Sequence, residues 1–163
     1  MLSAKITRLY YPFLFLICLN GQAQSGNDQK SPDFKSIVES KKYAFLVQSA
    51  TTKKGKTVHL TPGYGMILMN DSISVHLPYY GRAYNTGYSS TDDSGIQFNS
   101  HDFTYSSDST KKNRWEITIR PKGVKVSVMY LSISSNGYCT IRINSSDRDA
   151  ISYYGTIEGL PHH

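Results

Sequence analysis

Apolar and polar side chains alternate along most of the chain after its first forty residues. Successive side chains of a β-strand point to opposite faces of a sheet, so an alternation with a period of two predicts strands. The predicted core-facing sets are Phe45 and Val47; Val58 and Leu60; Met66 and Leu68; Ile73, Val75 and Leu77; Ile96 and Phe98; Trp115, Ile117 and Ile119; Val124, Val126, Val128 and Tyr130; Cys139, Ile141 and Ile143; and Ile151, Tyr153 and Ile157.

Short turn sequences separate these apolar runs. They are Lys-Gly at 54–55, Asn-Asp at 70–71, Pro-Lys-Gly at 121–123 and Asn-Gly at 136–137. Glycine and asparagine tolerate the positive φ of tight hairpins, so the strands that they join should be antiparallel neighbours. The pattern therefore predicts a mostly β domain, an antiparallel meander of about eight or nine strands. The polar face of each strand fits a barrel or a sandwich equally well.

One short helix is predicted before the first strand. Ser31 can cap it, Pro32 suits its first position, and Phe34, Ile37 and Val38 share one face. We expect this helix to plug one end of the sheet or to lie across it. The polar residues 24–31 are expected to be a flexible leader, and 32–163 a single β-rich domain.

The first 23 residues have the pattern of a signal peptide. Lys5 and Arg8 precede an apolar run over 9–19, and small residues end the segment at Gly21 and Ala23. Cleavage after Ala23 would leave a protein that is periplasmic or secreted. The apolar run is about half of the roughly 20 residues that span a bilayer, so no stable membrane span is expected after cleavage.

A lipoprotein signal is the alternative for the same segment. Cys18 would be the lipidated residue, and such a signal requires a small residue just before the cysteine. Ile17 occupies that position, and Cys18 lies inside the apolar run. The sequence therefore favours a protein without a lipid anchor.

Charge and cysteine content add two constraints. The chain has 18 basic and 12 acidic residues, a net charge of +6, which becomes +4 when Lys5 and Arg8 leave with the signal peptide. The basic clusters at 53–56 and 111–114 suit solvated turns, where lysines normally lie, or attraction to acidic envelope polymers or anionic lipid head groups. Nucleic acid is not an expected partner of an exported protein. Cys139 would be the only remaining cysteine, with no disulfide partner, and its alternating run predicts burial.

Two segments carry an arginine close to a Tyr-Tyr-Gly step, at residues 77–84 and 148–155. In a structural interpretation, Pro78 and Gly81 shape a strand end, the tyrosine hydroxyls face water, and Arg82 ties down a loop carbonyl or carboxylate. In a functional interpretation, tyrosines stack on sugar rings and arginine binds an anionic group. We expect both segments to border one surface. The candidate ligand-binding residues are Tyr79, Tyr80, Arg82, Tyr84, Arg148 and Tyr154.

Catalytic and metal-binding signals are weak. His59, His76 and His101 are scattered without the spacing of metal ligands. No nucleophile elbow, phosphate-binding glycine loop or paired-carboxylate pattern occurs. The sequence assigns no catalytic residue, no metal and no other cofactor, and it does not favour an enzyme.

The chain resembles the Bacteroidetes domain of unknown function 4251, a family of exported proteins that carry signal peptides or lipoprotein signals. The motifs that carry the resemblance are Leu-Pro-Tyr-Tyr-Gly-Arg-Ala at 77–83, Gly-Ile-Gln-Phe at 95–98 and Asp-Arg-Asp-Ala-Ile-Ser-Tyr-Tyr-Gly-Thr-Ile at 147–157. The resemblance covers nearly all of the chain that follows the leader. It implies export but no catalytic residues, because the family has none assigned.

Three functions remain as hypotheses. The first is a non-enzymatic binding module for a polar envelope ligand or glycan. The second is a structural or protein-interaction component of the cell envelope, and the third is a hydrolase whose site matches no motif. The sequence leaves open the oligomeric state and the identity of any small polar ligand, glycan or envelope protein that binds.

Overall fold

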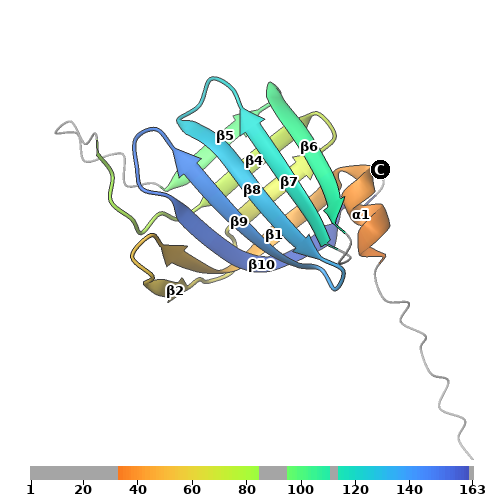
Figure 1. Cartoon of the computed structure of the whole chain (residues 1–163), viewed down its shortest axis with the longest axis horizontal. Coiled ribbons are helices and arrows are strands. Elements are labelled where there is room, and N and C mark those ends of the chain that lie inside the picture. The colour runs from red at the N-terminus through yellow and green to blue at the C-terminus, as the bar shows by residue number, and fades with distance from the viewer. Residues whose placement is uncertain (1–32, 85–94, 111–113, 162–163) are drawn as a thin grey trace, which may run out of the picture. The chain divides into compact units, whose positions relative to one another are not determined.

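A single antiparallel sheet carries the fold (Figure 1). The computed structural model describes residues 33–84, 95–110 and 114–161, so the predicted signal peptide and leader lie outside the described residues. The elements are α1 (Phe34–Ser40), β1 (Lys42–Thr52), β2 (Thr57–His59), β3 (Gly65–Met69), β4 (Ser72–Leu77), β5 (Ile96–Ser100), β6 (Phe103–Thr110), β7 (Arg114–Pro121), β8 (Val126–Ser134), β9 (Tyr138–Ser145) and β10 (Ile151–Gly159).

The strand order confirms the predicted meander, and the pairing of the last strand with the first bends the meander round on itself. The order is β5-β4-β3-β1-β10-β9-β8-β7-β6, and β2 pairs with β1 beyond β3. The last strand returns to the first, with β10 running antiparallel to β1 from Tyr43↔Gly159 to Thr52↔Ile151. The predicted turns at 54–55, 70–71 and 136–137 lie between successive strands, and the turn at 121–123 begins at Pro121, the last residue of β7.

The two edge strands, β5 and β6, are neighbours in the chain. Only His101 and Asp102 separate them, so the two edges of the sheet must meet at that point. The corner is fixed by Lys122, whose backbone N–H donates to the Asp102 carbonyl and whose ammonium group lies 2.9 Å from the Asp102 carboxylate. The sheet is therefore a nearly closed barrel, which decides between the two predicted architectures.

The inward faces of the strands form one hydrophobic core. Most of the predicted core-facing positions are buried, including Phe45, Leu68, Leu77, Ile119 and Ile141. Cys139 is also buried, as predicted, and burial raises the pKa of its thiol, which keeps the thiol protonated and unreactive.

One predicted core-facing set is correct only in its first part, since Val126 is buried and Val124 packs partly against the core. Val124, Val126, Val128 and Tyr130 were expected to point inward together, but a β-bulge between Val126 and Val128 shifts the register of β8 against β9. A bulge adds one residue to a strand, so the alternation changes phase beyond it. Tyr130 is consequently exposed, while the core-facing residues of β8 after the bulge are Met129, Leu131 and Ile133.

Strand β6 was not predicted from the sequence. Phe103 and Tyr105 alternate and pack partly against the core, but the rest of the strand is polar. An edge strand needs backbone pairing on one side only, here with β7, so it does not require a continuous apolar face.

Helix α1 covers one end of the barrel, as expected. Its predicted apolar face is correct, because Val38 is buried while Phe34 and Ile37 pack partly against the core. The predicted cap is wrong. The helix begins two residues later than Pro32, and the Asp33 carboxylate accepts the cap hydrogen bond from the Ser36 N–H at 3.3 Å.

Candidate functional site

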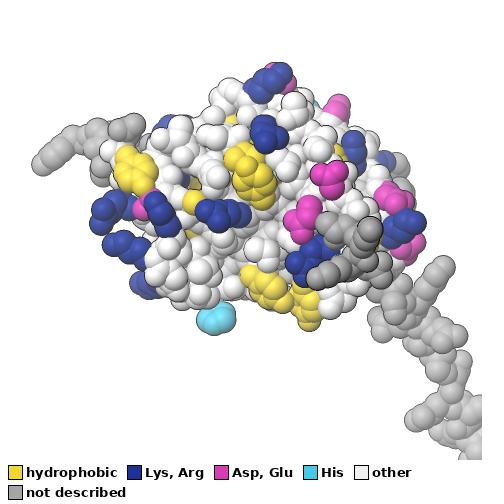
Figure 2. All heavy atoms as spheres, viewed as in Figure 1, with side chains coloured by type: hydrophobic (Ala, Val, Ile, Leu, Met, Phe, Trp, Pro, Cys, Tyr) yellow, Lys and Arg dark blue, Asp and Glu magenta, His cyan; other side chains and the backbone are white. Residues whose placement is uncertain are grey.

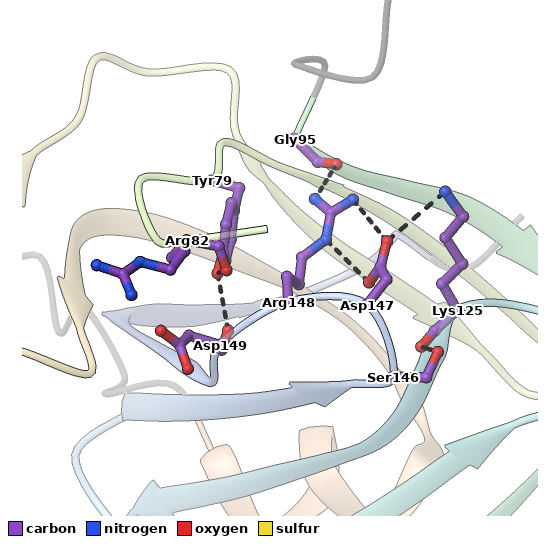
Figure 3. A network of polar contacts seen from close by, with 8 residues as sticks. All are labelled: Tyr79, Arg82, Gly95, Lys125, Ser146, Asp147, Arg148 and Asp149. Carbon is purple, nitrogen blue, oxygen red and sulfur yellow. Dashed lines mark hydrogen bonds and ion pairs between the residues drawn. The ribbon is translucent and has the colours of Figure 1, made fainter. Parts of the chain in front are cut away.

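Two segments far apart in the sequence meet where β4 ends and β10 begins (Figure 3). Ala83 and Arg148 form an antiparallel bridge. The Tyr84 N–H donates to the Asp147 carbonyl at 2.7 Å, and the Asp149 N–H donates to the Arg82 carbonyl at 2.9 Å. We call this contact between residues 78–84 and 147–149 the junction. It places the two arginine-containing motifs against each other.

Proline and glycine shape the first half of the junction. β4 ends at Leu77 because Pro78 has no N–H to continue the ladder. Gly81 leaves room for the Tyr79 side chain to fold back, since a Cβ there would lie 2.3 Å from the Tyr79 hydroxyl. The hydroxyl lies within hydrogen-bonding distance of the carbonyls of Arg82 (2.9 Å) and Asp149 (3.0 Å). Tyr79 therefore ties the segments together instead of pointing its hydroxyl into water as expected.

Arg148 is a buried structural tie. Its side chain is only 8% exposed. Its Nε and Nη2 donate to the Asp147 carboxylate at 3.1 Å each, and Nη1 donates to the Gly95 carbonyl at 3.1 Å (Figure 3). Its guanidinium group also lies 4.9 Å from the centre of the Tyr79 ring. The loop-tying role predicted for Arg82 is thus performed by Arg148.

The Asp147 carboxylate links this tie to a further strand. Lys125, just before β8, lies 3.6 Å from it, and Ser146 donates through its N–H and its hydroxyl to the Lys125 carbonyl. The hydrogen bonds from Arg148, followed by its charge and that of Lys125, hold the pKa of Asp147 below its usual value. Arg148 and Asp147 therefore connect the junction to the start of β5 and to the segment that leads into β8.

Arg82 is turned away from Arg148. The two guanidinium groups lie on opposite sides of the Tyr79 ring (Figure 3), so they do not converge on one anion site. Arg82 instead lines a cleft of about 250 Å³ on the outer side of the junction. We call it the basic cleft, and its lining residues are Thr52, Lys53, Lys54, Lys56, Tyr80, Gly81, Arg82 and Asp149.

The lysines of the basic cleft come from the turn between β1 and β2. The pairing Thr52↔Ile151 in the β1–β10 seam brings that turn beside the start of β10. Figure 2 shows Lys and Arg side chains gathered at the end of the barrel where this turn lies. Residues 111–113 of the second basic cluster lie outside the described residues.

Asp149 is the one acidic residue among the residues that line the basic cleft. Lys53 lies 3.2 Å from its carboxylate, and the Tyr84 hydroxyl donates a hydrogen bond to it. The Tyr84 hydrogen bond, followed by Lys53 and the charge of Arg82, lowers the pKa of Asp149, so this carboxyl group is ionised at neutral pH.

The six candidate residues divide into three groups. Tyr80 and Arg82 line the basic cleft, and Tyr84 borders it through Asp149. Tyr79 and Arg148 are occupied by contacts within the junction. The remaining residue, Tyr154, lies apart on the outer face of β10, where its ring stacks on Tyr138 at 5.9 Å between centres.

Sequence reasoning missed Asp149 as a member of the site, and it interpreted the lysine turn at 53–56 chiefly as a solvated loop tip. Asp149 and the lysines at 53–56 could be recognised in the sequence as charged residues in turns. Their proximity depends on the pairing of β1 with β10, which no local pattern encodes.

A second cleft lies on the other side of the Arg148 tie. It has a volume of about 310 Å³ and lies between the start of β5 and the turn from β7 to β8, with Phe98, Val124 and Arg148 in its lining. Within the described part of the chain, no three His, Cys, Asp or Glu side chains lie close enough together to bind a metal ion. No helix of residues 33–161, as far as they are described, is long and apolar enough to cross a membrane.

Fold and site together define the class: a small antiparallel barrel-like domain with a polar cleft at a strand-end junction. The family model for a domain of unknown function, DUF4251, matches residues 26–157, so the chain belongs to this family, as its motifs indicated. A search of curated proteins found no match.

A solved structure shares the fold. The crystal structure of a DUF4251 family protein from Bacteroides eggerthii is similar to this chain with a TM-score of 0.59 and 14% sequence identity. The match covers 78% of this chain and 85% of that chain. At this level of identity the similarity concerns the fold alone.

Proposed function

We propose that this chain is an exported, non-enzymatic binding module of the cell envelope. Its ligand is a polar molecule or glycan, and the ligand binds in the basic cleft. The signal-peptide pattern of residues 1–23 supports export to the periplasm or beyond the cell.

One observation carries this proposal: four basic side chains from two distant segments line one cleft beside the exposed ring of Tyr80. Three of them are the lysines of the β1–β2 turn and the fourth is Arg82. Arginine presents planar donors that suit polar and anionic oxygens, and a tyrosine ring offers an apolar face to a sugar ring. The combination suits a polar ligand better than a lipid chain.

Affinity electrophoresis in gels that contain soluble polysaccharides tests the proposal. Neutral dextran, polygalacturonate and a phosphorylated mannan cover neutral, carboxylated and phosphorylated glycans. We expect at least one polymer to retard the wild-type protein, and Arg82→Ala to weaken that retention about tenfold, because it removes charge-assisted hydrogen bonds. Arg120→Ala removes an exposed arginine of β7 and serves as the matched control.

Two results would count against the proposed function. One is a wild-type protein that no polymer retards. The other is retention that Arg82→Ala and Arg120→Ala change to the same extent, which would place binding outside the basic cleft.

A second function has its own observation. Leu46, Ile67, Tyr138 and Tyr154 are exposed on the outer faces of the neighbouring strands β1, β3, β9 and β10, and we call them the outer strip. Exposed apolar side chains on adjacent strands suit contact with another protein, as in a structural component of the envelope. In that case Leu46→Asp should change the sedimentation behaviour of the protein at high concentration, while glycan retention is absent.

A further inference from the structure

We propose that the basic cleft binds a doubly charged anion of the phosphate-monoester kind, and that Asp149 is a built-in counter-ion which the ligand partly replaces. This inference rests on the proposed function and specifies the chemistry of its ligand. It follows from the number of charges in the cleft, from their partners and from the size of the cleft.

The cleft has more positive than negative charge. Lys53, Lys54, Lys56 and Arg82 contribute four positive charges, and Asp149 contributes one negative charge. Asp149 pairs with Lys53, whereas Lys54, Lys56 and Arg82 form no ion pair with any residue that the structure describes. A ligand with two negative charges matches this excess better than a neutral sugar or a single carboxylate does.

Asp149 is held where an entering anion would meet it. Its carboxylate lies in the cleft lining and accepts from Lys53 and from the Tyr84 hydroxyl. In the unliganded protein it neutralises Lys53. When a dianion enters, the same carboxylate repels it, so Asp149 lowers the affinity for anions, while the excess of basic side chains in the lining keeps the net attraction for a dianion.

The size of the cleft suits a small group. Its volume of about 250 Å³ is below the roughly 300–1,000 Å³ of pockets that enclose drug-sized ligands. It can hold one anionic group with an attached sugar ring against Tyr80, which is 45% exposed. A phosphorylated sugar, free or at the end of a glycan, has this size and charge.

Isothermal titration calorimetry with glucose 6-phosphate, inorganic phosphate and glucose as probes tests the inference. We expect both phosphates to bind the wild-type protein and glucose to bind at least tenfold more weakly. Asp149→Asn should tighten phosphate binding about three- to tenfold, because it removes one repulsive charge and releases Lys53. Raising the salt concentration should weaken the binding of both phosphates.

Asp149→Asn is expected to fold, since the junction uses the backbone N–H and carbonyl of Asp149, which the substitution keeps. Asp102→Asn is the matched control. It removes one exposed acidic group at the β5–β6 corner, changes the net charge equally, and should leave the affinity within about twofold of wild type, because Asp102 is not among the residues that line the cleft.

The outcomes separate the two proposals. If a glycan is retained in an Arg82-dependent way but Asp149→Asn leaves phosphate affinity unchanged or weakens it, the basic cleft is a polar-ligand site and the inference is wrong. It is also wrong if the protein binds phosphatidylglycerol vesicles and glucose 6-phosphate does not compete, because the target is then a membrane surface. If Arg82→Ala alters neither glycan nor phosphate binding, the proposed function fails as well.

Discussion

Arg82 and Arg148 show at the residue scale how burial decides what a side chain does. Arg148 is almost fully buried, and its donors are taken by the Asp147 carboxylate and the Gly95 carbonyl. Arg82 is exposed and lines the basic cleft. Both arginines lie near a Tyr-Tyr-Gly step in the sequence, so the motif could identify both but could not tell their roles apart.

Replacing Arg148 should destabilise the protein. Arg148→Ala leaves the Asp147 carboxylate and the Gly95 carbonyl without their main donor, and loss of one partner of a buried ion pair is costly. We expect a loss of about 2–4 kcal/mol in the free energy of unfolding, and a melting temperature roughly 5–15 °C lower. Differential scanning calorimetry measures both, with Arg120→Ala as the exposed control. Equal melting temperatures for the two variants would show that Arg148 is not a structural tie.

The same tie should make stability depend on pH. The pKa of Asp147 in the folded protein is lowered below the ordinary value of 3.8, chiefly by its hydrogen bonds from Arg148. A lowered carboxyl pKa contributes stability that is fully present above the unfolded pKa and is lost as the pH falls through the folded pKa. Urea unfolding from about pH 5 to pH 3 should therefore show a declining free energy of unfolding.

Asp147→Asn tests the source of that decline. The variant lacks the titrating group, so its free energy of unfolding should depend less steeply on pH in this range, although it is less stable at neutral pH. Arg148→Ala should flatten the decline too, because it removes the main cause of the lowered pKa. Wild-type slopes in both variants would contradict this assignment.

At the scale of secondary-structure elements, the sequence predicted those features that depend on the preferences of a few neighbouring residues. The hairpin turns and the end of β4 before Pro78 follow from glycine, asparagine and proline preferences. The predicted alternation of β8 was wrong after Val126, because a bulge depends on pairing with β9, and β6 was missed because an edge strand can be polar. The basic cleft could not be predicted, since the turn at 53–56 reaches Arg82 only through the β1–β10 pairing.

The β1–β10 seam should be sensitive at Gly155, which pairs with Val47 beside the bulge in β1. A Cβ at Gly155 would lie 2.0 Å from the Leu46 carbonyl oxygen, so Gly155→Ala must push the strands apart. We expect a loss of about 1–3 kcal/mol and faster amide hydrogen exchange along both strands. Thr156→Ala, on the outer face of the same strand, is the control. Equal stability of the two alanine variants would contradict the tight approach of these strands.

At the scale of the whole described domain, closure of the sheet creates the basic cleft. The meander and the family were predictable, because the alternation, the turns and the ordered motifs can each be recognised within short stretches of the sequence. The sequence could not distinguish a barrel from a sandwich, because that distinction depends on the pairing of β10 with β1 and on the corner between β5 and β6. The same return brings Lys53, Arg82 and Asp149 together.

The most direct test of the central claim is to map where a ligand binds. Backbone amide chemical shifts of the ¹⁵N-labelled protein would be followed while an oligosaccharide of the retained polymer is added. We predict that the largest changes fall on residues 53–56 and 80–82 and on Asp149, which surround the basic cleft. Changes confined to the outer strip, around Leu46 and Tyr154, would contradict the proposed site and favour the interaction function.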